Sequence, residues 1–162
     1  MKDKLKYSKG LLRIILGWIF LWAFWDKVFG LGFATEADKS WLNGTSPTSG
    51  FLKFSTSGPF ADIFQSMAGN PLIDWLFMLG LLLLGSALIL GIASKLTTIG
   101  GSIMLALMYL AAIPPEHNPL VDEHIIYILI LFGFYIDETN HSLGFGKKWE
   151  KCKLVKKYPI LQ

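Results

Sequence analysis

Two groups of ionisable residues lie within or beside apolar segments, where their side chains could transfer protons or hold a charged ligand. Asp26 and Lys27 come late in the first apolar segment, and Asp122, Glu123 and His124 come just before the last one. Carboxylates and an imidazole can pass a proton, and an ammonium can hold an anion or pair with a carboxylate. We expect the two groups to meet, because ionisable groups in apolar surroundings are costly unless they pair or face a polar cavity.

Three kinds of site are compatible with these residues. The first is an ion-pair lock that only fixes the register of two helices. The second is a proton or substrate site, in which Tyr127 shares a helix face with His124 at i, i+3 and with Glu123 at i, i+4. The third is a metal site that adds Glu116 and His117, whose types suit zinc or iron. His117 and His124 match no common metal spacing, so these are weak candidates and we predict no metal.

Both groups belong to apolar segments, but the last apolar run, Ile125 to Ile136, has only 12 residues. Of the 162 residues, 52% are apolar and 17% charged, and the charges gather between the apolar segments. A helix needs roughly 17–25 residues to cross, so the last span must begin near Pro119 and include Asp122 to His124. We therefore predict an all-α membrane protein, a single domain in which four transmembrane helices form an antiparallel bundle. The expected spans are about 11–33, 72–93, 96–113 and 119–136.

The long connection at 35–71 is too polar to span and too rich in aromatic residues for a disordered linker. We expect it to fold as an extracytoplasmic cap over the outer mouth of the bundle, with a short interfacial helix at about 62–68. Residues 137–162 form a basic tail, for which contact with anionic lipid is favoured over binding of nucleic acid. Cys152, the single cysteine, lies in this tail, so an internal disulfide and dithiol chemistry are excluded.

The charges of the connecting segments predict the orientation of the bundle. The N-terminal segment, the turn at Lys95 and the tail are basic, whereas the two longer connections are acidic. The positive-inside rule then places both termini in the cytoplasm, in a multi-pass protein of the cell membrane. The two ionisable groups would share the outer half of the bilayer, which makes their meeting geometrically feasible.

The first apolar segment also carries an arginine and a row of tryptophans. Arg13 lies at its entry, where a long side chain can reach the lipid headgroups. Trp18, Trp22 and Trp25 share one helix face at i, i+4, i+7. They would pack and anchor the helix at the interface, or offer a surface on which a quinone ring stacks.

The ordered set of motifs resembles the DoxX/DoxD family of small four-helix membrane proteins, over roughly residues 10–146. It comprises Arg13 and Gly17, then DKVFGLG, WLNGTSPTSGFL, SGPFAD, LGLLLLGSALILGIASK and NPLVDEHIIY. The family includes a membrane subunit of an archaeal thiosulfate:quinone oxidoreductase, which oxidises thiosulfate to tetrathionate and reduces a membrane quinone. The resemblance therefore implies a subunit of a quinone-linked redox system, with a membrane quinone or a second redox subunit to accept the electrons.

On this interpretation the site residues divide into two sets, with the polar proton or substrate site at the outer mouth, and the protein could assemble as a homo-oligomer within the lipid bilayer. Lys27 would hold an anionic substrate or the partner carboxylate, and Asp122, Glu123 and His124 would handle the proton that accompanies quinone chemistry. The catalytic set is Asp26, Lys27, Asp122, Glu123 and His124, and the substrate-binding set is Arg13, Trp22, Trp25 and Tyr127. The alternative is a non-enzymatic scaffold or small-solute channel, in which the same charges form the ion-pair lock.

Overall fold

The computed structural model of the chain describes residues 2–136 and 142–161. Within these ranges all regular structure is helical. Residues 137–141, where the predicted tail begins, lie outside the described part. The four longest helices are α1 (Lys2–Phe29), α4 (Pro71–Leu90), α5 (Ser94–Ala111) and α6 (Glu123–Ile136).

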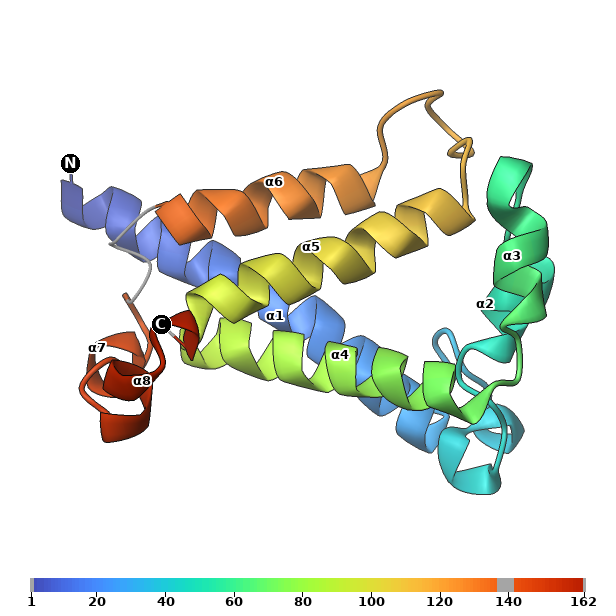
Figure 1. Ribbon diagram of the computed structural model, residues 1–162, viewed down its shortest axis with the longest axis horizontal. Coiled ribbons are helices and arrows are strands. Elements are labelled where there is room, and N and C mark those ends of the chain that lie inside the picture. The colour runs from blue at the N-terminus through green and yellow to red at the C-terminus, as the bar shows by residue number, and fades with distance from the viewer. Residues whose placement is uncertain (1, 137–141, 162) are drawn as a thin grey trace.

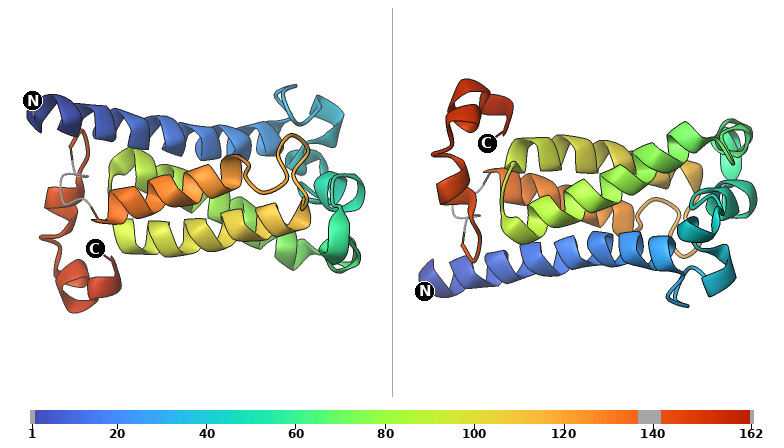
Figure 2. Two further views of the ribbon diagram at one scale, coloured as in Figure 1. Left: turned by 90° about the horizontal axis from the view of Figure 1, so that it is seen from above. Right: turned by 90° about the horizontal axis from the view of Figure 1, so that it is seen from below.

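These four helices lie side by side and run in alternating directions (Figures 1 and 2). α1 packs on α4, α4 on α5 and α5 on α6, while α1 and α6 touch only slightly. Both chain termini and the α4–α5 turn lie at one end, which we call the basic end. The connection 30–70 and the segment 112–122 lie at the opposite end, which we call the loop end. The apolar core between the helices is formed mainly by Leu16, Phe20, Met78, Leu81, Leu105 and Leu131.

α1 and α4 approach so closely that their backbones touch at two glycines. A Cβ atom added to Gly85 would lie 2.7 Å from the backbone nitrogen of Leu21, and one added to Gly17 would lie 2.9 Å from the carbonyl oxygen of Gly85. Neither position has room for a side chain. Small residues of this kind allow close helix packing in membrane proteins.

α4 and α5 are each long and apolar enough to cross a membrane. α6 is also apolar but has only 14 residues, fewer than a helix needs to cross a bilayer by itself. Large apolar side chains are exposed along all four helices, among them Trp18, Leu76, Leu83, Ile103 and Leu129. Surfaces of this kind suit a lipid environment better than water.

Two of the predicted span boundaries were wrong at the loop end. α1 ends at Phe29 instead of continuing to residue 33, because Gly30 adopts a left-handed conformation with φ 65°. The last helix begins at Glu123 and not near Pro119. The carboxylate of Asp122 accepts hydrogen bonds from the backbone N–H groups of His124 and Ile125, and this fixes the start of the helix.

The connection 30–70 is ordered and folds across the loop end (Figure 2). It contains the short helices η1 (Ala37–Lys39), η2 (Trp41–Asn43), α2 (Ser49–Phe54), η3 (Gly58–Phe60) and α3 (Ala61–Ser66). α3 corresponds to the short helix expected at about 62–68. The backbone N–H of Ser57 donates to the carbonyl of Ala111 at 3.0 Å and thereby attaches the connection to the end of α5. At η1, Lys39 lies 2.6 Å from Glu36 and lowers the pKa of that exposed carboxyl.

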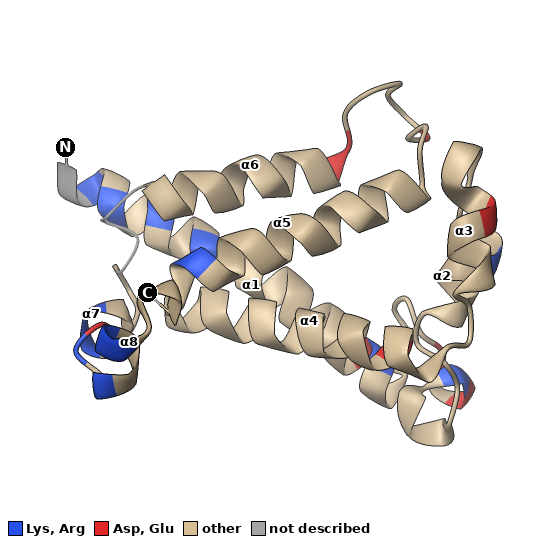
Figure 3. Ribbon diagram, viewed as in Figure 1, with Lys and Arg blue, Asp and Glu red and all other residues tan. Residues whose placement is uncertain are grey.

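The C-terminal segment forms α7 (Gly146–Trp149), α8 (Lys153–Lys157) and η5 (Pro159–Leu161). These short helices project to one side of the bundle at the basic end (Figures 1 and 2). Lysine and arginine side chains are concentrated at this end, while all the acidic residues that Figure 3 shows on or beside the long helices lie towards the loop end.

Candidate functional site

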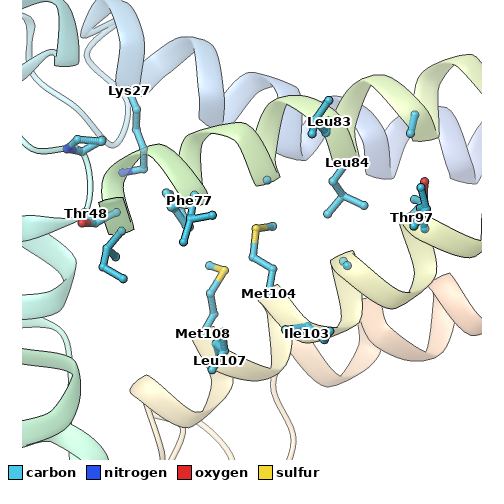
Figure 4. A pocket seen from close by; sticks show the side chains of 18 of the residues that line it. Lys27, Thr48, Phe77, Leu83, Leu84, Thr97, Ile103, Met104, Leu107 and Met108 are labelled. Atoms are coloured by element: carbon cyan, nitrogen blue, oxygen red, sulfur yellow. The ribbon is translucent and has the colours of Figure 1, made fainter. Parts of the chain in front are cut away.

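An apolar groove of about 920 Å³ lies along α4 and α5 and extends to the connection at the loop end. Its walls are formed almost entirely by aliphatic, aromatic and methionine side chains, including Ile73, Phe77, Leu84, Ile103, Met104 and Met108 (Figure 4). The lining residues follow nearly the whole of α4, whose 20 residues measure about 30 Å at 1.5 Å per residue. A long, narrow apolar molecule would fit such a groove better than a compact one.

The two ends of the groove differ in polarity. Lys27 and Thr48 lie at the loop end, and Trp149 of the C-terminal segment lies at the basic end. In the part of the chain that the structure describes, Lys27 is the one charged residue that lines the groove. The groove is therefore apolar along its length, with a single cationic group at one end.

Lys27 reaches from α1 towards Thr48 and Phe77 (Figure 4). Its side chain is partly buried, and its ammonium makes neither a hydrogen bond nor an ion pair with any described residue. An ammonium in apolar surroundings is stabilised by an acceptor or an anion. The free donor at the end of the groove is therefore suited to the polar group of a bound molecule.

Asp26, the neighbour of Lys27, has a different and local role. Its side chain is 1% exposed, and its two carboxylate oxygens accept hydrogen bonds from the backbone N–H groups of Phe33 and Ala34 at 3.2 and 3.0 Å. Asp26 thus closes the turn that follows α1. This arrangement leaves Lys27 without a carboxylate partner within ion-pair distance, although the two residues are adjacent.

A second buried carboxylate, Asp74, holds Thr48 at the edge of the groove. One of its oxygens accepts from the hydroxyls of Ser46 at 2.8 Å and Thr48 at 2.5 Å, and from the backbone N–H of Thr48 at 3.3 Å. Nearby, the rings of Trp41 and Trp75 lie 4.7 Å apart and pack the connection on α4. The role of Asp74 was not predicted from the sequence. The available signal was an acidic residue in the first turn of a helix, after a segment rich in serine and threonine.

The two ionisable groups that were expected to meet do not pair. His124 Nδ1 lies 2.7 Å from Asp122 Oδ2, so this pair is formed within one turn of the chain. Glu123 is exposed. Among the described residues no ion pair or hydrogen bond joins this group to Asp26 or Lys27, because the carboxylates of Asp26 and Asp122 are each occupied by neighbouring backbone N–H groups. The predicted interhelical pairing was wrong.

The weak metal candidates do not form a cluster. Glu116 and His117 are exposed in the segment between α5 and α6. No group of three or more potential metal ligands occurs among the described residues. His124 is already engaged with Asp122.

The aromatic residues predicted to bind substrate contact other rings outside the groove. Trp22 lies 5.7 Å from Trp18 and 5.1 Å from Phe33, and Trp25 stacks on Phe29 at 5.5 Å. Tyr127 meets the edge of Phe20 at 6.2 Å. None of the three predicted residues, Trp22, Trp25 and Tyr127, lines the groove.

Arg13 does not extend to a headgroup region as expected. It is 1% exposed, and its guanidinium donates to the carbonyls of Leu88 and Ile89 at the end of α4 and to that of Ser142 at 3.0 Å. A positive charge is favourable at this position, since the carbonyl end of a helix is partly negative. Arg13 therefore joins α1, α4 and the C-terminal segment at the basic end, far from the Lys27 end of the groove.

Comparisons of the chain with protein family models, with curated proteins and with solved structures found no match.

Proposed function

We propose that all four long helices cross the membrane and that the groove along α4 and α5 binds a membrane quinone, in a protein that serves as a subunit of a quinone-linked redox system. The observation that carries this proposal is the unpartnered ammonium of Lys27 at one end of a long apolar groove. A membrane quinone matches both features, because it has a carbonyl-bearing ring and a long apolar tail. The ring would lie beside Lys27 and the tail would follow α4 and α5.

Lys27 would act by donating a hydrogen bond to a carbonyl oxygen of the ring. Hydrogen bonds to a charged group contribute about 1.5–3 kcal/mol, and the contribution is larger where water is excluded. Such a donor also favours reduction of the ring, because it stabilises the negative charge that reduction places on that oxygen. Asp74 would position Thr48 at the same end, so that the ring has a fixed polar boundary.

The electrons would come from a second redox subunit. The single Cys152 excludes an internal dithiol as their carrier. The resemblance to the DoxX/DoxD family motivates thiosulfate as the electron donor of the assembly. In this proposal Asp122 and His124 are exchangers of protons at the loop end and do not contact the ring.

The alternative is a non-enzymatic scaffold or small-solute channel fixed by an interhelical ion-pair lock. It has less support than quinone binding, because no ion pair joins Asp26 or Lys27 to the Asp122–His124 group in the described part of the chain. If the groove held only ordinary phospholipid, a non-enzymatic scaffold would again be the better interpretation. The test of the proposal must therefore separate quinone from phospholipid.

The first experiment is extraction and mass spectrometry of the protein purified in mild detergent, compared with Lys27→Met. The wild-type protein should carry about one quinone per chain, and the variant should bind quinone roughly 10- to 100-fold more weakly, the equivalent of one charged hydrogen bond. Lys53→Met, which changes an exposed lysine outside the groove, is the matched control and should bind like the wild type.

A second pair of variants tests whether the tail lies in the groove. Gly100 lines the groove and has open space around it, so Gly100→Leu should fill the groove and displace the quinone. Gly133 on α6 is a helical glycine with equally open surroundings outside the groove, and Gly133→Leu should have no effect. Stoichiometric phospholipid without quinone, or quinone retained by both Lys27→Met and Gly100→Leu, would contradict the proposal.

A further inference from the structure

The C-terminal segment 142–161 is a fixed part of the molecule, and we call it the platform. Ser142 links it to α1 twice: Arg13 donates to the Ser142 carbonyl, and the Ser142 hydroxyl donates to the carbonyl of Lys6 at 2.6 Å. The backbone N–H of Phe145 donates to the carbonyl of Leu90 at 2.8 Å, which attaches the platform to the end of α4. These contacts hold the start of the platform against two long helices.

The far end of the platform is attached as well. Lys95 at the start of α5 donates from Nζ to the carbonyl of Pro159 at 3.2 Å. Within the platform, Trp149 Nε1 donates to the carbonyl of Leu161 at 2.5 Å, and Val155 is fully buried. The platform is therefore anchored at both ends, which gives its surface a defined position relative to the bundle.

The surface of the platform combines positive charge with exposed apolar side chains. Its six lysines are all exposed, and Glu150 is its one acidic residue. The platform also carries five large apolar side chains, each of which is 47–56% exposed. The lysines are Lys147, Lys148, Lys151, Lys153, Lys156 and Lys157, and the apolar residues are Leu143, Phe145, Leu154, Tyr158 and Ile160.

The platform projects sideways from the bundle, at the level of the first turns of α1 (Figures 1 and 2). If the long helices cross a bilayer, this direction runs along the membrane surface and not away from it. Lysines interleaved with aromatic and aliphatic side chains are typical of surfaces that lie among lipid headgroups. Lys4, Lys6 and Lys9 on α1 extend the positive charge of the same end.

We propose that the platform docks on anionic phospholipid headgroups of the leaflet at the basic end, with its apolar side chains inserted between them. This inference rests on the membrane-spanning part of the proposed function and not on quinone binding. A basic surface with aromatic residues also suits RNA, but the exposed aliphatic side chains and the position beside the bundle favour lipid.

Cys152, the single cysteine of the chain, is exposed on the platform and allows a direct test. A nitroxide attached to Cys152 in the full chain reports its depth through its accessibility to oxygen and to a water-soluble nickel complex. We expect the accessibility to the nickel complex to fall several-fold in vesicles that contain phosphatidylcholine and anionic phosphatidylglycerol, compared with vesicles of phosphatidylcholine alone. This fall in nickel accessibility should disappear at about 1 M salt, where charge interactions are screened beyond roughly 3 Å.

Two variants separate charge from folding. Replacing all six platform lysines with glutamine should abolish the fall in nickel accessibility that phosphatidylglycerol causes, whereas replacing them with arginine should preserve it. The same nickel accessibility in the two kinds of vesicle would overturn the proposal. So would a nickel accessibility that falls when single-stranded RNA is added to the protein in detergent but does not fall in vesicles with phosphatidylglycerol. Carbonate extraction of the same vesicles distinguishes the two levels of failure: a chain that carbonate removes would overturn the membrane-spanning proposal too, and a retained chain with unchanged depth would overturn only the docking.

Discussion

Lys27 and Asp26 are adjacent in the last turn of α1, yet their side chains make different contacts. The Asp26 carboxylate is buried and accepts two backbone N–H groups from the turn after α1, while the Lys27 ammonium lies at the end of the apolar groove. The Asp122 carboxylate similarly serves the start of α6. At the scale of single residues, the carboxylates of Asp26 and Asp122 stabilise a turn and a helix start, and neither forms an ion pair with Lys27.

This assignment predicts that Asp26→Asn destabilises the protein. Asparagine keeps one acceptor oxygen and places an N–H donor where the second was, so one of the backbone N–H groups of Phe33 and Ala34 loses its partner. The free energy of unfolding in detergent, measured by circular dichroism, should fall by about 1–3 kcal/mol. Asp38→Asn, at an exposed position in the same connection, should leave it unchanged. Equal losses in both variants would contradict the capping role of Asp26.

At the scale of helices, the contact between α1 and α4 depends on the absence of side chains at Gly17 and Gly85. The groove forms on the neighbouring side, where α4 and α5 diverge towards the loop end (Figure 1). The connection 30–70 then supplies Thr48 to the groove through its bonds to Asp74. The close packing of α1 on α4 and the divergence of α4 from α5 together create the space for a ligand.

Gly85→Ala should therefore weaken the packing of α1 on α4. Its new Cβ would lie 2.7 Å from a backbone nitrogen, which cannot move without shifting the helix. Overpacking of this kind costs about 1–3 kcal/mol. Gly133→Ala is the matched control: it meets open space, and alanine stabilises a helix by about 0.5–1 kcal/mol relative to glycine. Thermal unfolding should move in opposite directions in the two variants, and stabilisation by both would refute the close contact.

At the scale of the whole molecule, the two ends of the helix bundle differ both in charge and in the segments that form them. The basic end contains the N-terminal turns of α1, the α4–α5 turn and the platform, whereas the loop end contains the folded connection (Figure 3). Four membrane crossings would place these two ends on opposite sides of a bilayer. If only α4 and α5 crossed, the path of the chain would put the connection and the residues after α5 on the same side, and the platform could not form its hydrogen bond to Leu90 at the far end of α4.

Cysteine labelling distinguishes these two topologies. The native Cys152 should react with a membrane-impermeant maleimide from one side only, which the positive charge of the basic end predicts to be the cytoplasmic side. In the variant Cys152→Ser with Ser66→Cys on α3, the new thiol should react only from the outside, since both positions are exposed and lie at opposite ends. Permeabilised cells, in which both thiols should react, control for accessibility. Labelling of the two positions from the same side would rule out four crossings.

The sequence by itself determined the helical class, the approximate positions of the long helices, the short helix in the connection and the separation of charge between the two ends. These features depend on runs of apolar residues and on local charge, which can be recognised within one segment of the chain. Only the tertiary structure decided how the polar side chains are used. Arg13 is buried because α4 ends beside it, and Asp74 meets Ser46 and Thr48 because the connection folds back. Lys27 faces a groove whose walls come from distant helices, and no pattern along the chain encodes such a pairing of remote segments.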